Sequence, residues 1–509
     1  MTTEILGQTR NMSAIQSIVI VGRDMACWLA ANSLKLALGF SGVKITVIEL
    51  PSLVNNCETL SSLPALESLH RILGFEEYEL LKLTAGTYGL GHSFANFSKS
   101  NVPFFHPYAT HGASINKLDF LQYWIKARRS GLQLDFESFS LNTIAAKNER
   151  FFLPTTELYS FAKSNYGYNM QAQAYIRYIR EMALRRGVEL ISSHNVAGKL
   201  DKEQGHIDSV FLSNGQEIKA DLFIDATGAE GVLIKETLKT DFKSWKDYFP
   251  QDRILLTCGE KLKTLPPYGQ TRALNDSVLQ LVPLQNMTGL IHSYDSELMD
   301  DQSALETAAI VSNLRIHPNA QTVVTPFSAG HVSQIWVKNC IAIGESAASL
   351  HPIDNVALQT IHLGLVHLIN LFPLGRDMAL EARAYNEVMI SSIERLRDFQ
   401  LSHFKLNQYF DSPFWDYMRQ IKVPDELAHK IDLFKARGNI ALYDNETFEN
   451  DDWKAIFICH GLMPETYDPL VDQTSDQEAI RQFQAMMTYI KDQVKDMVSH
   501  DAFLEVYTQ

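Results

Sequence analysis

The sequence has 509 residues, enough for a large hydrophobic core, and its 46% hydrophobic and 20% charged residues are typical of a globular chain. A formal net charge of −14 disfavours a nucleic-acid-binding surface and docking on anionic lipid. No apolar run reaches the length of about 18 residues that a membrane span needs. The composition therefore predicts neither a nucleic-acid nor a membrane partner.

The first residues lack the apolar run of a signal peptide, and we predict a disordered extension over residues 1–15. Five cysteines are dispersed without any Cys-x-x-Cys pair: Cys27, Cys57, Cys258, Cys340 and Cys459. An odd, scattered set without a secretion signal indicates reduced thiols and a cytoplasmic protein. The 16 histidines show no ligand spacing, so no metal site is predicted.

The first strand, Ser17–Gly22, and a helix expected at residues 26–38 form a βα unit of the dinucleotide-binding type. The usual Gly-x-Gly-x-x-Gly is replaced by Gly22-Arg-Asp24-Met-Ala26-Cys27, in which only the first glycine remains. Asp24 places a carboxylate where a phosphate would rest on the helix N-terminus. Gly22 and Ala26 are candidate cofactor contacts, and Cys27 is expected to be a small buried filler.

A second strand at residues 44–49 ends in Glu49, which is placed to accept hydrogen bonds from ribose hydroxyls. Helices are predicted at residues 64–73 and 166–186, the latter with a solvated basic face that includes Arg180. Residues 188–213 alternate as antiparallel strands do.

A buried strand near residues 220–228 delivers the turn Ala226-Thr227-Gly228, whose small residues let a bound dinucleotide approach the backbone. A later strand at residues 339–344 leads into Gly344 and Glu345. Glu345 either contacts the cofactor or caps the next helix.

The turn that follows contains His351-Pro352-Ile-Asp354, and a helix then extends to residue 371. Pro352 is a candidate cofactor contact, and His351 is expected to be packed in the core. Asp354 is a candidate catalytic residue, with helix capping as the alternative. Residues 376–509 are predicted to be largely helical.

These segments, taken in order, resemble the flavin-dependent tryptophan halogenases, a branch of the FAD monooxygenase superfamily. The resemblance is carried by Phe104-Phe-His-Pro-Tyr108, Tyr166-Gly-Tyr-Asn-Met-Gln-Ala172, Asp221-Leu-Phe-Ile-Asp-Ala-Thr-Gly228, Trp336-Val-Lys-Asn-Cys-Ile-Ala-Ile-Gly344 and His403-Phe-Lys-Leu-Asn407. It implies an α/β fold with a glutathione-reductase-like Rossmann domain for FAD over residues 16–375. An interleaved antiparallel sheet on the substrate side and a mostly helical subdomain over residues 376–509 would complete it.

The resemblance also implies FAD as cofactor, a separate flavin reductase as partner, chloride or bromide as co-substrate and a small aromatic substrate. In that family a hypohalous acid formed at the flavin crosses a tunnel to a lysine, and a nearby glutamate assists the transfer to the substrate. A tunnel of this kind keeps the substrate away from the dry flavin pocket.

The chain departs from the family pattern at ligand-contacting positions. Gly89 stands at the lysine position, and the Trp-x-Trp-x-Ile-Pro motif becomes Val278-Leu-Gln-Leu-Val-Pro283. Asp354 replaces the glutamate, and Asn355-Val356-Ala357 replaces the halide-binding Ser-Thr-Gly. Backbone N–H groups of Val356 and Ala357 could still hold a halide. Cys57-Glu-Thr-Leu-Ser-Ser62 replaces a glycine-containing FAD-contact run.

Two functions remain open from the sequence. One is FAD-dependent oxidation or halogenation of an aromatic substrate, with FAD bound weakly. The other is a catalytically inactive halogenase-fold protein that has lost FAD and binds a protein partner. Whether the chain forms a homodimer is also open.

Overall fold

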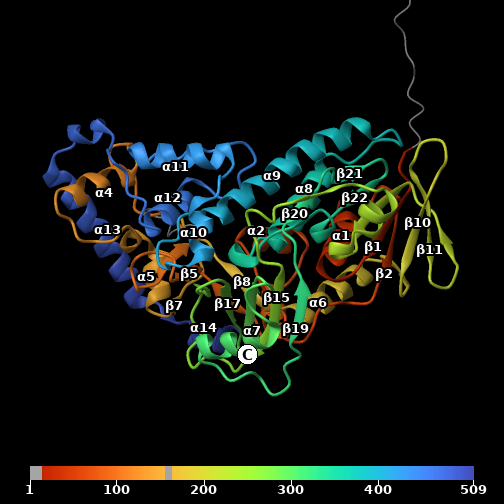
Figure 1. Ribbon diagram of the computed structural model, residues 1–509, viewed down its shortest axis with the longest axis horizontal. Coiled ribbons are helices and arrows are strands. Elements are labelled where there is room, and N and C mark those ends of the chain that lie inside the picture. The colour runs from red at the N-terminus through yellow and green to blue at the C-terminus, as the bar shows by residue number, and fades with distance from the viewer. Residues whose placement is uncertain (1–13, 155–162, 509) are drawn as a thin grey trace, which may run out of the picture.

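The computed structural model describes residues 14–154 and 163–508, so the extension predicted for residues 1–15 lies almost entirely outside the described residues. The molecule is elongated, with the N-terminal strands at one end and the helices α4, α11, α12 and α13 at the other (Figure 1). The long helix α9 (Ala379–Lys405) runs between the two ends.

A six-stranded sheet forms the first end, in the order β21-β22-β13-β1-β2-β9. Its strands are Trp336–Val337, Cys340–Ala342, Leu222–Ala226, Ser17–Gly22, Lys44–Glu49 and Glu189–Ser192, and all pairs except β21–β22 are parallel. The central strand β1 is a continuous β-branched run that is buried on both faces, as parallel strands require.

Each face of this sheet is covered by a different layer. Ile18 and Ile20 belong to the main core, where helices α1 (Asp24–Leu38), α6 (Ala172–Arg185) and α8 (Ala357–Asn370) pack. Val19 and Val21 face the antiparallel strands β10 (Val196–Leu200), β11 (Ile207–Leu212) and β12 (Glu217–Ile218). The sheet is therefore the middle layer of a three-layer α/β unit.

A seven-stranded sheet forms the middle of the molecule, in the order β19-β15-β18-β17-β16-β5-β6. It comprises Val323–Pro326, Arg253–Gly259, Thr288–Tyr294, Val278–Pro283, Gly269–Ala273, Gly91–Ala95 and Phe104–Pro107, antiparallel except for the β16–β5 pair. Three further groups of strands are small: β3-β8-β4 (Thr59–Ser61, Gly167–Gln171, Thr87–Gly89), β14-β20-β23 (Phe242–Ser244, Gly330–Val332, Ala348–Ser349) and β24-β7 (Val498–Ser499, Arg150–Phe151).

Most of the C-terminal part is helical, as predicted. Beyond α9 it contains α10 (Pro413–Gln420), α11 (Asp425–Arg437), α12 (Asn450–Cys459), α13 (Asp476–Asp496) and α14 (His500–Thr508). Helix α13 packs on α5 (Leu141–Lys147), α14 packs on α3 (Glu77–Leu83), and α10 packs on α9. Helix α4 (Phe120–Arg129) lies at the same end as α11, α12 and α13. Helices α2 (Ala65–Ile72) and α7 (Asp301–Ser312) contact strands of the sheets. None of the helices in the described ranges is long and apolar enough to cross a bilayer.

The fold class predicted from the sequence is confirmed, with two local corrections. The helix expected from residue 166 begins at Ala172, because Gly167–Gln171 pairs with β3 and β4 instead. Of the strands expected at 188–213, β9 is parallel to β2, and only β10 and β11 form the antiparallel pair.

Candidate functional site

The predicted dinucleotide turn is built on close backbone contacts. A Cβ atom on Gly22 would lie 2.4 Å from the carbonyl oxygen of Ala226, and one on Gly344 would lie 2.9 Å from Cβ of Ala26. Gly344 also has φ +70°, which favours glycine. Four of the predicted cofactor residues therefore converge at the C-terminal edge of the parallel sheet, where such folds bind nucleotides.

The small-residue turn after β13 is held by Asp225, which sequence reasoning missed. Its buried carboxylate accepts hydrogen bonds from the Thr227 amide at 3.0 Å and hydroxyl at 2.7 Å, and from the amides of Leu233 and Ile234 at 2.8 Å each. Ser346 donates a further bond at 3.2 Å from the turn after Gly344. One carboxylate thus joins the two predicted turns. The sequence feature that could have revealed this role is an acidic residue inside an otherwise apolar strand.

Asp24 occupies the position of the second fingerprint glycine and keeps its backbone conformation. Its φ is +58°, in the left-handed region, and α1 begins there. The carboxylate accepts a 3.3 Å hydrogen bond from the Leu53 amide, so the side chain is tied to the segment after β2. Cys27, at the third glycine position, is fully buried, which confirms the expected packing role.

Three carboxyl groups, those of Asp24, Glu58 and Glu345, lie close together beside the turn after β1, and this group of residues is called the nucleotide recess below. Burial and the proximity of Glu345 and Asp24 raise the pKa of Glu58 to about 8. Burial raises the pKa of Asp24 as well. Glu345 remains open to solvent within this recess and does not cap a helix as the alternative reading held.

Glu49 is engaged by an arginine. Arg180 donates to its two carboxylate oxygens at 2.8 and 3.0 Å, the planar two-point geometry typical of Arg–carboxylate pairs. The guanidinium also lies over the Trp28 ring, 5.3 Å from its centroid. The prediction that Arg180 belongs to a solvated basic face is wrong, since its partner is the acid predicted to bind ribose.

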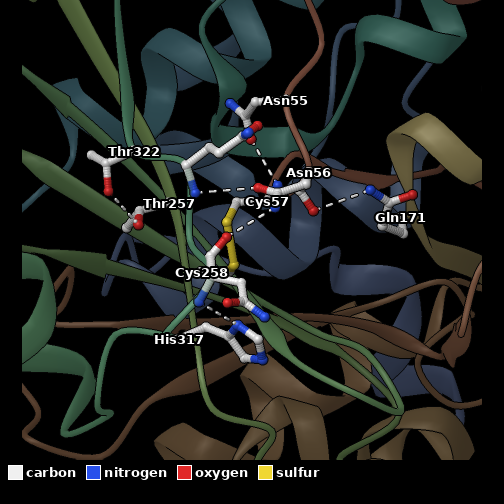
Figure 2. The surroundings of a disulfide bond; sticks show 10 residues. Asn55, Asn56, Cys57, Gln171, Thr257, Cys258, His317 and Thr322 are labelled. Carbon is white, nitrogen blue, oxygen red and sulfur yellow. Dashed lines mark hydrogen bonds between the residues drawn. A yellow bond between two sulfur atoms is a disulfide. The ribbon is translucent and has the colours of Figure 1, made fainter.

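A covalent bond links the segment before β3 to the seven-stranded sheet (Figure 2). Cys57, buried in the segment that precedes β3, forms a disulfide with Cys258 of β15. Asn55 accepts from the Cys57 amide at 2.7 Å, and Gln171 donates to the Asn56 carbonyl at 3.1 Å. The prediction of reduced thiols is therefore wrong for this pair. The two cysteines meet only because their sheets pack together in the fold, and their spacing along the chain does not indicate a bond.

Two of the positions that depart from the family motifs lie in β17 of the seven-stranded sheet, and a third ends β4 of a smaller sheet. Gly89 ends β4, and a Cβ there would have its nearest neighbours at 3.9 and 4.0 Å. Val278 is buried in β17, and the side chain of Gln280 donates to the carbonyls of Pro352 and Ile353 at 2.8 and 3.0 Å. Gln280 thus anchors the turn that carries Asp354.

Asp354 is 5% exposed and lies in a short 3-10 turn, Pro352–Asp354. It does not cap α8, because that helix begins at Ala357 with Val356 as its N-cap residue, and no side chain caps it. Its Oδ1 lies 3.2 Å from Nε2 of His403 on α9. Burial and Asp452 raise its pKa to about 7, although His106 opposes the shift.

A cavity of about 310 Å³ opens beside this turn. It lies between the start of α2, the strand end at Tyr108, helix α8 and the segment before α12, and its lining includes Lys163, Gln359, Phe448 and Asp452. Gln359 is 8% exposed, and its side-chain amide has no hydrogen-bond partner in the described part of the chain. The Gln359 amide is therefore free to hydrogen-bond a molecule in this cavity, as the few polar groups of small-molecule sites do.

His351, by contrast, is packed as predicted. Its ring is 1% exposed and lies against Phe249 and Phe404. Burial lowers its pKa to about 3, so the imidazole is neutral.

The comparisons with known proteins agree with one another. A family model for tryptophan halogenases matches residues 17–476. The chain is similar to tryptophan 7-halogenase KtzQ of Kutzneria sp. (strain 744), with 24% identity over 97% of this chain and 98% of that protein. It is also similar in structure to BrvH, a flavin-dependent halogenase from Brevundimonas sp. BAL3, with TM-score 0.92 and 29% identity over 97% of this chain and 99% of that one.

A flavin-dependent halogenase from Xanthomonas campestris gives a TM-score of 0.92 at 26% identity, over 97% of this chain and 98% of that one. The match to the family model includes both the nucleotide recess and the Asp354 turn, so it does not rest on the common Rossmann unit alone. The chain belongs to the tryptophan halogenase family.

Proposed function

We propose that the protein is a flavin-dependent enzyme that oxidises or halogenates a small aromatic compound. The observation that carries this proposal is the cavity beside Asp354, with the unpartnered amide of Gln359 in its wall. Its volume of about 310 Å³ is at the lower end of the range for small-molecule sites. Phe448 and Tyr108 offer ring contacts to an aromatic guest.

The family implies FAD, and the backbone of this chain fits that cofactor. Close packing at Gly22 and Gly344 brings the turns after β1, β13 and β22 together at the sheet edge, and Asp225 fixes the two turns that would face a dinucleotide there. The charges fit only in part, because ionised Asp24, Glu58 and Glu345 would repel a diphosphate. With a pKa of about 8, Glu58 carries its proton at neutral pH, which lessens that repulsion.

When bound in its reduced form, FAD would react with molecular oxygen and so supply the oxidising chemistry. A separate flavin reductase would provide the reduced cofactor. On the substrate side, α8 begins without a side-chain cap, so the backbone N–H groups near Val356 and Ala357 can hold chloride or bromide. Pro352 and Gln280 keep that turn in place. Asp354 is the candidate catalytic group beside it.

Halogen delivery by a lysine at residue 89 is not available to this chain. The site has room for a side chain, since a Cβ on Gly89 meets nothing closer than 3.9 Å. We still expect Gly89→Lys alone to give no halogenated product, because Asp24 and the Asn355-Val356-Ala357 turn also differ from the family. Chlorination by that single variant would contradict this expectation.

One observation favours a second function. Asp24 stands where the phosphate loop should be neutral, and it is held in place by the Leu53 amide. A catalytically inactive family member that binds a protein partner would tolerate this carboxylate without cost. A homodimer is compatible with either function.

We further propose a cytoplasmic location, which rests on the free thiols of Cys27, Cys340 and Cys459. The Cys57–Cys258 bond is the observation that weighs against it, because disulfides are uncommon in that compartment.

The test is a titration of the purified chain with oxidised and reduced FAD, followed by turnover with a flavin reductase, bromide and a panel of indoles and phenols. Mass spectrometry of the products separates oxygen insertion from halogenation. Saturable binding and a new product in the complete mixture, absent without reductase, are expected. Failure of either redox form of FAD to bind would overturn the enzymatic function and favour the partner-binding one.

A further inference from the structure

Two uncharged polar side chains in the wall of the cavity beside Asp354 have no partner within the protein. Gln359, in the first turn of α8, is 8% exposed, and its side-chain amide bonds no group among the described residues. The buried hydroxyl of Thr447, in the segment before α12, likewise has no partner in the described part of the chain. An amide offers two N–H donors and a carbonyl acceptor, and a hydroxyl can donate or accept. Both groups can therefore form hydrogen bonds to a guest.

The acidic groups of the cavity wall, by contrast, are already engaged. Asp452 bonds His106 at 2.9 Å and accepts from the Glu449 amide at 2.7 Å. The Glu449 carboxylate accepts from the Asp452 amide in return, which completes a capping box at the start of α12. Lys454 donates to Asp451 at 3.2 Å. These acids hold the N-terminus of α12 in place, and the two uncharged groups are left free to bind a guest.

The charge of the wall disfavours a carboxylate on the guest. The lining side chains that the structure describes include three acids, Glu449, Asp451 and Asp452, and one lysine, Lys163. Lys163 is exposed, so water weakens its attraction for an anion. A carboxylate in this cavity would meet a net negative charge, and an aromatic amino acid should therefore bind less well than the same ring without its carboxylate.

The apolar part of the wall suits a flat ring. Phe448 is 4% exposed and stacks on Phe399 with a centroid separation of 3.6 Å, so its ring is fixed. Tyr108 supplies a second aromatic side chain, and Leu63 and Pro64 add apolar surface just before α2. A volume of about 310 Å³ suits a small ring system.

We propose that Gln359 is a specificity-determining residue of this cavity, where its side-chain carbonyl accepts a hydrogen bond from a ring N–H or O–H of an aromatic ligand that lacks a carboxylate. A helix holds such an acceptor more precisely than a loop does. A ligand without the N–H or O–H leaves the buried carbonyl unpaired, so the binding of that ligand loses affinity. The inference rests on the proposed function only in taking this ligand as the substrate, whereas the binding contact does not depend on it.

The first test compares two ligands of the same shape and needs no substitution. Indole carries a ring N–H, and benzofuran has in its place an oxygen that cannot donate. Calorimetric titration of the purified, FAD-free chain should show indole bound about tenfold more tightly than benzofuran, as one hydrogen bond provides. Tryptophan should bind more weakly than indole because of its carboxylate. Equal affinity for indole and benzofuran, tighter binding of tryptophan, or no saturable binding of indole would overturn the proposal.

The second test removes the amide. Gln359→Met keeps the length of the side chain without its hydrogen-bonding groups, and we expect this variant to bind indole and benzofuran equally. The matched control is Gln302→Met at an exposed position of α7, which should keep the native ratio. Thr447→Val should also keep it, although this variant removes the other free group of the wall. A ratio that falls in Thr447→Val and stays in Gln359→Met would assign the contact to Thr447 and overturn the role of Gln359.

A stability measurement separates a binding role from a structural one. Because the Gln359 amide bonds no group in the described ranges, Gln359→Met should melt within about 2 °C of the native protein or above it. A much lower melting temperature would mean that the amide has a partner in the native fold, and the proposal would fail. A chain that does not bind FAD would leave the indole and benzofuran result standing. Turnover of both ligands with equal KM would overturn the contact and leave the proposed function intact.

Discussion

The nucleotide recess and the Asp354 interior both collect carboxyl groups, but they treat them differently. In the recess, Asp24, Glu58 and Glu345 face one another in a space that solvent reaches. In the interior, Asp354 faces a histidine and almost no solvent. The carboxyl groups of the first region therefore stand in partial contact with solvent, whereas Asp354 is enclosed by the core. A ligand-contacting surface can therefore change its charge without disturbing the strands that carry it.

The largest effect should come from breaking the frame shared by both regions. Gly22→Val would place a Cβ 2.4 Å from the Ala226 carbonyl oxygen, and neither backbone can move without disrupting the parallel sheet. We expect a loss of about 4 kcal/mol or more in the free energy of unfolding, measured by urea denaturation. Gly89→Ala is the control, since its Cβ has space, and it should change stability by less than about 1 kcal/mol.

The covalent link between the recess and the middle sheet should come next. Cys57→Ser with Cys258→Ser, or reduction of the native protein, should lower stability by about 2–4 kcal/mol. The matched control is Cys459→Ser, which removes a free, partly exposed thiol. Equal melting temperatures for all three proteins would show that the bond contributes nothing to the native fold.

Asp24 allows the charge in the recess to be changed by itself. Asp24→Gly restores the residue type suited to φ +58° and removes a negative charge, and Asp24→Asn removes the charge while keeping the size. Both should tighten FAD binding about tenfold, which is about 1.4 kcal/mol, in a fluorescence titration. If only Asp24→Gly improves binding, backbone strain and not repulsion limits the affinity.

The smallest expected effect is the pH profile of FAD binding. With a pKa of about 8, Glu58 gains a negative charge as pH rises through that value, so FAD affinity should fall a few-fold between pH 7 and 9. Glu58→Gln should flatten this profile. Glu297→Gln, at an exposed and remote position, should leave it unchanged. A native profile that is already flat would place the phosphates away from Glu58.

The sequence predicted the frame because its signals are local. The apolar run of β1, the turn Ala226-Thr227-Gly228 and the helix beginning near Ala357 each follow from a few neighbouring residues. The partners of the charged groups could not be predicted in this way. Arg180 reaches Glu49 across 131 residues, and His460 reaches His403 across 57. Such pairs depend on tertiary packing, which periodicity does not record.

The bond between Cys57 and Cys258 closes a covalent ring across a sequence separation of 201 residues, and this ring includes Glu58 and the turn after β13. A single proteolytic cut at any point between these two cysteines would open the ring without releasing a fragment. Such a nicked molecule would keep its full mass on a denaturing gel until a thiol is added. Limited proteolysis with and without reductant would therefore show which surface segments a protease can reach while the nucleotide edge stays assembled.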